Sequence, residues 1–107
     1  MLDLTAFNRA AFQESASAAA ALLRTLANEK RLMILCQIGD GELSVGALQE
    51  RVGLSQSALS QHLALLREDG VLATRRQAQT IFYRIADPNA VRVIATLAEI
   101  FCPEPQP

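Results

Sequence analysis

The sequence is poor in the residues from which most catalytic and metal sites are built. Its 107 residues include no tryptophan, one tyrosine, one histidine and two cysteines. The cysteines, Cys36 and Cys102, lie far apart, so they do not form the close pair of a zinc ribbon or a thioredoxin-type motif. No nucleophile–base pair, phosphate-binding glycine loop or carboxylate pair is visible either. We therefore expect no enzyme activity, no metal site and no cofactor.

Long apolar runs are also missing. No stretch approaches the ~20 apolar residues that a membrane-spanning helix requires, and Asp3, Arg9 and Glu14 do not fit a signal peptide. We expect a cytoplasmic protein with no membrane partner, in which the cysteines are reduced. Half of the residues are hydrophobic, which argues against disorder and suits one small domain over residues 1–107.

The charge of the chain is weakly acidic overall but unevenly distributed. A net charge of −1 and an isoelectric point near 5.7 count against nucleic-acid binding, since such domains are often basic. The segment 54–85 nevertheless has four arginines against two acidic residues, a balance of +2. These residues are Arg67, Arg75, Arg76, Arg84, Glu68 and Asp69. The local excess has the sign expected where a domain meets nucleic acid.

Helical periodicity predicts helices at both ends of the chain. Apolar and alanine residues at helical spacing predict a first helix over 6–24. Asn28 is a suitable N-cap for a second helix. Asp87 followed by Pro88 predicts the start of a last helix, which runs to Cys102.

Two shorter helices are predicted in the middle of the chain. Ser44 caps the first, in which Val45 and Leu48 are expected to point inward. Ser55 caps the second, and Gly70 ends it in a left-handed conformation. The apolar stripe of this second helix consists of Leu59, Leu63 and Leu66.

Alternating residues further along predict a β-hairpin. Strands over 71–77 and 80–86 are expected to flank a short turn at Ala78. The order of elements predicts a mainly α fold with a β-hairpin: a winged helix-turn-helix with five helices and a two-stranded wing. In this division residues 44–70 form the helix-turn-helix and residues 71–86 form the wing.

The fourth helix and the hairpin are predicted to contact double-stranded DNA. A recognition helix enters the major groove with its N-terminal residues, and here those residues are uncharged and polar. Glutamine can pair bidentately with adenine, serine can bond to any base edge, and arginines on a wing can neutralise phosphates. The expected contacts are Ser55, Gln56, Ser57, Ser60 and Gln61 on the helix, and Arg75, Arg76, Gln77 and Thr80 on the wing. The competing interpretations are a solvated helix face and a charged edge strand that opposes aggregation.

The two end segments predict a homodimer. Residues 1–26 and 88–102 present more apolar surface than one small core can hide, so they are expected to be dimerisation helices. A two-fold dimer would read an imperfect palindrome with half-sites about one helical turn, or ~34 Å, apart.

Four segments together resemble the ArsR/SmtB family of small winged-helix repressors. They are LANEKRLMIL (26–35), GELSVGAL (41–48), LSQSALSQHLALLREDG (54–70) and TRRQAQTIFYRI (74–85). The metal sensors of that family usually have a Cys-Val-Cys unit where this chain has Ser44 and Gly46, and others use histidines on the last helix, which has none here. The resemblance therefore implies the fold and DNA binding but no metal sensing.

The remaining cysteines resemble those of a thiol- and persulfide-sensing subgroup of the family, the BigR, SqrR, YgaV and HlyU type. That resemblance implies that Cys36 and Cys102 face each other within a subunit. Oxidation or persulfidation by reactive sulfur species would then join them and weaken operator binding, as in a sulfide-responsive repressor or a derepressor of virulence genes. Reaction needs a thiolate, but both cysteines are expected near helix C-termini, where the dipole disfavours negative charge. A neighbouring group must therefore lower the cysteine pKa, and Arg31 and Arg92 are the candidates.

Other interpretations remain open. The chain can also be a metal- or metalloid-responsive repressor that uses Cys36, Cys102 and a third ligand. It can equally be a protein-interaction module on the same fold. On spacing alone, Cys36 can be a small core residue and Cys102 a tail residue without a joint role.

Overall fold

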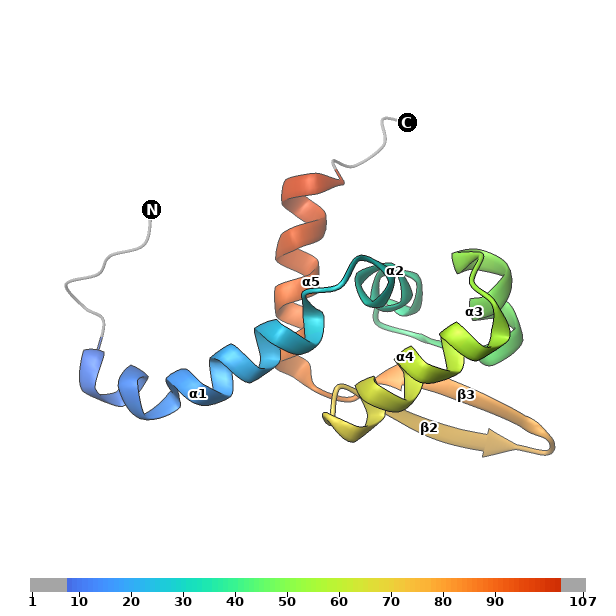
Figure 1. Cartoon of the computed structure of the whole chain (residues 1–107), viewed down its shortest axis with the longest axis horizontal. Helices are drawn as coiled ribbons and strands as arrows, with labels where there is room; N and C mark the ends of the chain where they lie inside the picture. The colour runs from blue at the N-terminus through green and yellow to red at the C-terminus, as the bar shows by residue number, and fades with distance from the viewer. Residues whose placement is uncertain (1–7, 103–107) are drawn as a thin grey trace.

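The computed structural model describes residues 8–102, and within that range it contains five helices and three strands. Figure 1 shows α2, α3, α4 and the sheet gathered in one body, from which α1 extends to one side and α5 rises. This confirms the predicted winged helix-turn-helix. In chain order the elements are α1 (Arg9–Leu26), α2 (Glu29–Ile38), β1 (Glu42–Ser44), α3 (Val45–Val52), α4 (Gln56–Glu68), β2 (Leu72–Gln77), β3 (Thr80–Ile85) and α5 (Pro88–Phe101).

Side-chain N-caps fix where four of the helices begin, as predicted. The oxygens of Asn28, Ser44, Ser55 and Asp87 accept hydrogen bonds from first-turn N–H groups of α2, α3, α4 and α5 in turn. Each such cap typically stabilises a helix by about 1 kcal/mol. The first helix differs from the prediction because it ends at Leu26 rather than at residue 24. The predicted start at residue 6 lies outside the described residues.

The predicted hairpin is confirmed, but it belongs to a three-stranded antiparallel sheet of order β1-β3-β2, so the expected two strands must be corrected to three. The third strand, β1, pairs Leu43 with Tyr83 of β3. It has only three residues, too few to show strand alternation, and its partner is about forty residues away in sequence. The predicted turn is confirmed at Ala78, which adopts a positive φ of 57°.

The core lies between the helices and one face of the sheet. The fully buried side chains of α4 are the predicted Leu59, Leu63 and Leu66. They pack with apolar residues of α2, α3, β2 and α5 in one cluster. Val45 does not join them: it is 39% exposed, so its predicted inward orientation was wrong. Val45 is the first residue of α3, directly after the cap, and it turns towards the wing instead.

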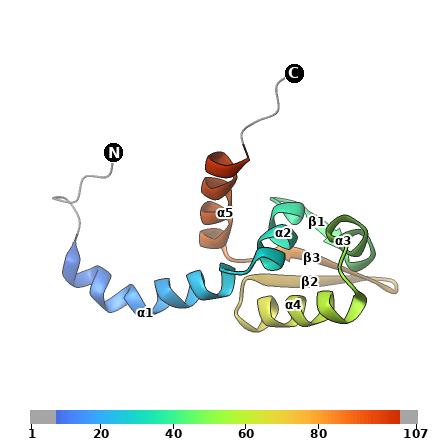
Figure 2. The same cartoon turned by 45° about the horizontal axis from the view of Figure 1, so that its top comes forward.

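The first helix packs on the body only near its C-terminal end. Figure 1 and Figure 2 show most of α1 extending away from the other elements. Its buried residues are Thr25 and Leu26 in the last turn. The hydroxyl of Thr25 donates to Asp69 Oδ2 at 2.7 Å, and Arg31 Nε donates to the carbonyl of Thr25 at 2.6 Å. These polar contacts fix the last turn of α1 against α2 and the end of α4.

Removing the Thr25 hydroxyl should loosen this attachment. We expect Thr25→Val to lower the free energy of unfolding by about 1.5 kcal/mol, the lower end for a hydrogen bond to a charged group, because Asp69 is exposed. Thr96→Val is the matched control, since its hydroxyl donates only to the Arg92 carbonyl on the exposed face of α5. Chemical denaturation of both variants checks this, and equal losses would contradict it.

Candidate functional site

The predicted base-reading residues form one exposed face of α4. Gln56, Ser57, Ser60 and Gln61 are all exposed, and their spacing of three and four residues places them side by side on the helix. The leucine stripe lies on the buried side of the same helix. We name these four residues the polar face of α4. The face is uncharged, so it can approach base edges without burying an ionised group.

Ser55 differs from the polar face because its side chain has a structural task. Its hydroxyl oxygen accepts the Ala58 N–H at 3.2 Å and caps the helix. It also lies 3.5 Å from the hydroxyl of Ser57. The cap occupies one acceptor position of the Ser55 hydroxyl, which leaves its proton and its second lone pair for the predicted DNA contact.

The polar face and the wing meet across a hollow of about 460 Å³. Figure 2 shows α4 alongside β2 at this side of the body. The hollow thus lies between the polar face of α4 and the wing, which the sequence predicted as two separate DNA contacts. Val45 and Gly46 of α3 also line the hollow. Its lining consists of Ser44, Val45, Gly46, Gln56, Ser60, Gln79, Thr80, Ile81 and Tyr83.

The two wing arginines lie on opposite faces of the sheet, although the sequence treats them alike. Successive residues of a strand alternate between faces, and Arg75 lies opposite Phe82 whereas Arg76 lies opposite Ile81. Ile81 lines the hollow beside the polar face. Arg76 therefore shares the face on which α4 lies, and no described residue is hydrogen-bonded to its guanidinium.

Arg75 is held by neighbours within its own sheet. It forms an ion pair with Glu42 of β1, donates to Gln77 Oε1 at 2.7 Å, and stacks over the Phe82 ring with 4.6 Å to the centroid. The hydrogen bond between Arg75 and Glu42 lowers the pKa of the Glu42 carboxyl and raises the pKa of Arg75. Arg75 must exchange these partners to contact a phosphate. Sequence reasoning missed Glu42, because β1 itself was not predicted.

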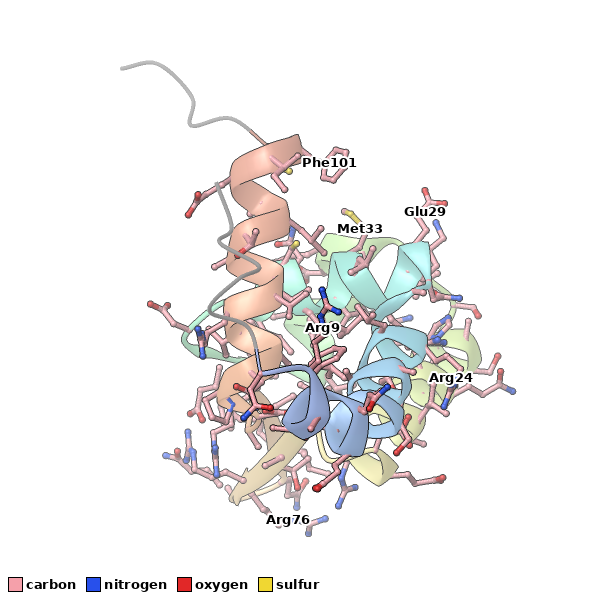
Figure 3. All side chains as sticks on the ribbon, turned by 90° about the vertical axis from the view of Figure 1, so that its left-hand side faces the viewer. Arg9, Arg24, Glu29, Met33, Arg76 and Phe101 are labelled. Carbon is pink, nitrogen blue, oxygen red and sulfur yellow. The ribbon has the colours of Figure 1, made fainter. Side chains whose placement is uncertain are left out.

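The two cysteines line a second hollow, of about 510 Å³, between α2 and α5. Cys36 lies on α2 and Cys102 is the C-cap of α5. In Figure 3, Phe101 at the end of α5 faces Met33 of α2 across the opening. Most of the lining is apolar. The described lining residues are Ala27, Asn28, Glu29, Leu32, Met33, Cys36, Ile94, Leu97, Ala98, Phe101 and Cys102.

Both cysteines are free thiols and both are exposed. Cys36 is thus not a core residue, so that part of the alternative interpretation was wrong. Partial burial in the hollow raises the pKa of the Cys36 thiol, and the nearby charge of Cys102 raises it further. The expected lowering of a cysteine pKa by an arginine is not found for Cys36. Arg31 instead donates to backbone carbonyls at the end of α1, and Arg92 lines a different hollow.

The single histidine lies in the middle of α4. His62 is half-buried on α4, and its pKa is lowered by burial first and by the positive charge of Arg31 second. It is therefore neutral near pH 7. Within residues 8–102 no three His, Cys, Asp or Glu side chains gather closely enough to hold a metal ion. No helix in that range is long and apolar enough to cross a membrane.

A helix-turn-helix with an uncharged polar face beside an arginine-bearing β-ribbon defines a class, the winged helix-turn-helix DNA-binding proteins. The family model described as "Bacterial regulatory protein, arsR family" matches residues 28–74. The chain belongs to the ArsR family. It is accordingly a DNA-binding transcriptional regulator and not an enzyme.

Curated relatives match well beyond the family segment. Transcriptional activator HlyU of Vibrio cholerae is 49% identical over 84% of this chain and 83% of its own length. The biofilm growth-associated repressor of Agrobacterium fabrum is 45% identical over 94% of this chain and 86% of its own. The HTH-type transcriptional regulator YgaV of Escherichia coli is 45% identical over 88% of this chain and 96% of its own length.

Solved structures agree with the fold. The transcriptional repressor BigR from Xylella fastidiosa superposes with a TM-score of 0.84 at 40% identity, over 92% of this chain and 100% of that one. Reduced HlyU from Vibrio cholerae superposes with a TM-score of 0.82 at 48% identity, over 85% of this chain and 96% of that one. Both matches extend over most of the described residues, so the arrangement of helices and wing is shared.

The raised pKa of Cys36 predicts slow alkylation at neutral pH. We expect the rate of Cys36 alkylation by iodoacetamide to rise over a higher pH range than that of a free cysteine, near 8.5. In the Cys102→Ser variant, the pH range over which the Cys36 alkylation rate rises should move part of the way towards that of free cysteine. The charge of Cys102 is then removed, while the partial burial of Cys36 remains. Mass spectrometry of the Cys36 peptide at a series of pH values measures this. If the alkylation rate of Cys36 rises at the same pH as that of free cysteine, or at a lower pH, the thiol is not held in its protonated form.

Proposed function

We propose that the protein is a homodimer whose binding to an imperfectly palindromic operator is switched by Cys36 and Cys102. The observation that carries this proposal is that both thiols lie on the wall of one hollow between α2 and α5. The cysteines are far apart in sequence, so their common position is a property of the fold. Reactive sulfur species are the proposed inducers.

The proposed DNA contacts divide by chemistry. The polar face of α4 reads base edges in the major groove, with glutamines suited to adenine and serines to several bases. Arg76, on the α4 side of the sheet, contacts phosphate and fixes the register of the protein on the duplex. Thr80 and Gln77 add neutral phosphate contacts. Arg75 contributes only when phosphate replaces Glu42.

The apolar surfaces of α1 and α5 support the proposed dimer. Leu23 on α1 is 58% exposed, and Ile100 and Phe101 on α5 are 60% and 75% exposed. Large apolar side chains gathered on projecting helices usually meet a partner. A second copy of the chain would cover them and would place two α4 helices at a fixed separation, as a palindromic operator requires.

The proposed switch is an oxidation of two thiols by one persulfide. One cysteine thiolate attacks the outer sulfur of R–S–SH, which forms a protein persulfide and releases RSH. The other thiolate attacks the Sγ atom of the first cysteine, which forms the Cys–S–S–Cys disulfide and expels the outer sulfur as H₂S. Two electrons pass from the cysteines to the persulfide. A further equivalent can instead leave extra sulfur in the bridge, and each atom lengthens it by about 2 Å.

The packing of α2 supplies a route from the thiols to the DNA surface. This helix contacts α3, α4, α5 and β3. A covalent link between Cys36 and Cys102 would draw α2 and the end of α5 together. Because packed cores shift between discrete arrangements rather than deform smoothly, α4 would move with α2. The two recognition helices of the dimer would then no longer match the operator spacing.

Binding measurements should distinguish the residues that read bases from those that contact phosphates. Gln61→Ala should cost ~1–3 kcal/mol on the duplex that the protein selects from a random pool, with less effect on other duplexes. Arg75→Ala with Arg76→Ala should weaken binding to every duplex and lower the salt slope by roughly 0.9 for each phosphate that is no longer neutralised. Fluorescence anisotropy at several salt concentrations measures both. Equal losses for Gln61→Ala on all duplexes would exclude base reading.

The thiol switch should depend on both cysteines. Cys36→Ser and Cys102→Ser should each bind the selected duplex as the unaltered protein does, and neither should release it when an organic persulfide is added. Anisotropy with and without persulfide, followed by reduction, tests this. A single-serine variant that still releases DNA would refute the two-thiol mechanism. Tight stoichiometric zinc binding that releases DNA would favour a metal sensor instead.

A further inference from the structure

The described lining of the hollow that holds the cysteines is mostly apolar and includes no positively charged residue. Its wall is made mainly of aliphatic and aromatic side chains from α2 and α5. The only charged residue among its described lining is Glu29, an acid, and the lining includes no Lys, Arg or His. Figure 3 shows Glu29, Met33 and Phe101 at the same end of the molecule, with Arg24 and Arg76 well away from them.

An anionic reagent is disfavoured in such a place for two reasons. An ionised group loses hydration when it enters an apolar wall, and no cation compensates for that loss. The carboxylate of Glu29 adds repulsion at the opening. A neutral apolar group meets neither cost and gains from the removal of its own surface from water.

We propose that this hollow selects thiol-reactive sulfur compounds whose organic group is uncharged and apolar, such as alkyl or aryl polysulfides, over reagents that carry an anionic group. The proposal rests on the proposed thiol switch, whose inducer it narrows to a chemical class. The volume of about 510 Å³ lies within the usual range of small-molecule sites. Met33 and Phe101 suit this class, since a flexible thioether adapts to varied shapes and an aromatic ring attracts sulfur.

The reaction with such a compound is balanced without another oxidant. One cysteine thiolate attacks a terminal sulfur of R–S–S–S–R, which forms a Cys–S–S–R mixed disulfide and releases RSSH after protonation. The second thiolate attacks the cysteine sulfur of that mixed disulfide, which forms the protein disulfide and releases RSH. The protons come from the two thiols. The cysteines lose two electrons and the trisulfide gains them.

Two methanethiosulfonates with the same leaving group test the selectivity on the full-length chain. Each transfers R–S to a thiolate and releases methanesulfinate; R is benzyl in one and 2-sulfonatoethyl in the other. Rates of protein modification are divided by the rates with N-acetylcysteine amide, which removes intrinsic reactivity. We expect the benzyl reagent to be at least tenfold favoured after this correction. Equal corrected rates, or a preference for the anionic reagent, would overturn the proposal.

A matched pair of variants locates the selectivity in the hollow. Met33→Lys replaces an exposed lining residue of α2 with a cation, so it should reduce the preference for the benzyl reagent severalfold. Ala95→Lys places the same charge on α5, at an exposed position outside the lining and outside the residues proposed to meet the second copy, and should leave the preference nearly unchanged. If both variants change it equally, net charge rather than the hollow sets the selectivity, and the proposal is wrong.

DNA release is followed in the same samples. Modification by both reagents at equal corrected rates with release of DNA would refute the selectivity and leave the switch intact. Selective modification that never releases DNA would refute the switch and leave the selectivity of the hollow established.

Discussion

The burial of one side of α2 is the constraint on which the rest of the structure depends. Ile34 and Leu35 are fully buried and Ile38 nearly so, and this side faces the core shared with α3, α4 and β3. The rotation of the helix about its axis is thereby fixed. The neighbouring side, with Met33 and Cys36, must then face α5. Without this packing, α4 would lose its support and the cysteine hollow would lose one wall.

Local chemistry made much of the fold predictable. Caps such as Asn28 and Ser55, and the leucine stripe of α4, act within one or two turns of the chain, so sequence order alone reveals them. The strand β1 and its Glu42 could not be predicted, because a three-residue strand is stabilised by a distant partner. For the same reason the different surroundings of Arg75 and Arg76 became visible only with the sheet register. The resemblance pointed to the cysteine pair, but not to the apolar lining that surrounds it.

The thiols and the residues proposed to contact DNA lie at separate places in the structure. Figure 3 shows Phe101, beside the cysteine hollow, and Arg76, on the wing, at opposite edges of the molecule. The partial burial that raises the pKa of Cys36 keeps the thiol protonated and slow to react with dilute reagents in water. A reagent that resides in the hollow instead has a high local concentration. In the proposed switch, binding and reactivity together, rather than reactivity alone, would then determine which compounds react with the thiols.

The length of the wing also limits how much of a duplex one copy of the chain can cover. Its two main strands have six residues each, which corresponds to a ribbon of ~20 Å. The half of β2 nearer the core is partly buried, whereas its distal half, roughly 10 Å long, is exposed. That length is comparable with the width of a single groove. The turn at Ala78 joins the strands by the shortest path, with no loop to extend further. In the proposed mode of binding, one copy of the chain would therefore touch only the bases under α4 and one adjacent backbone, which would keep each half-site short.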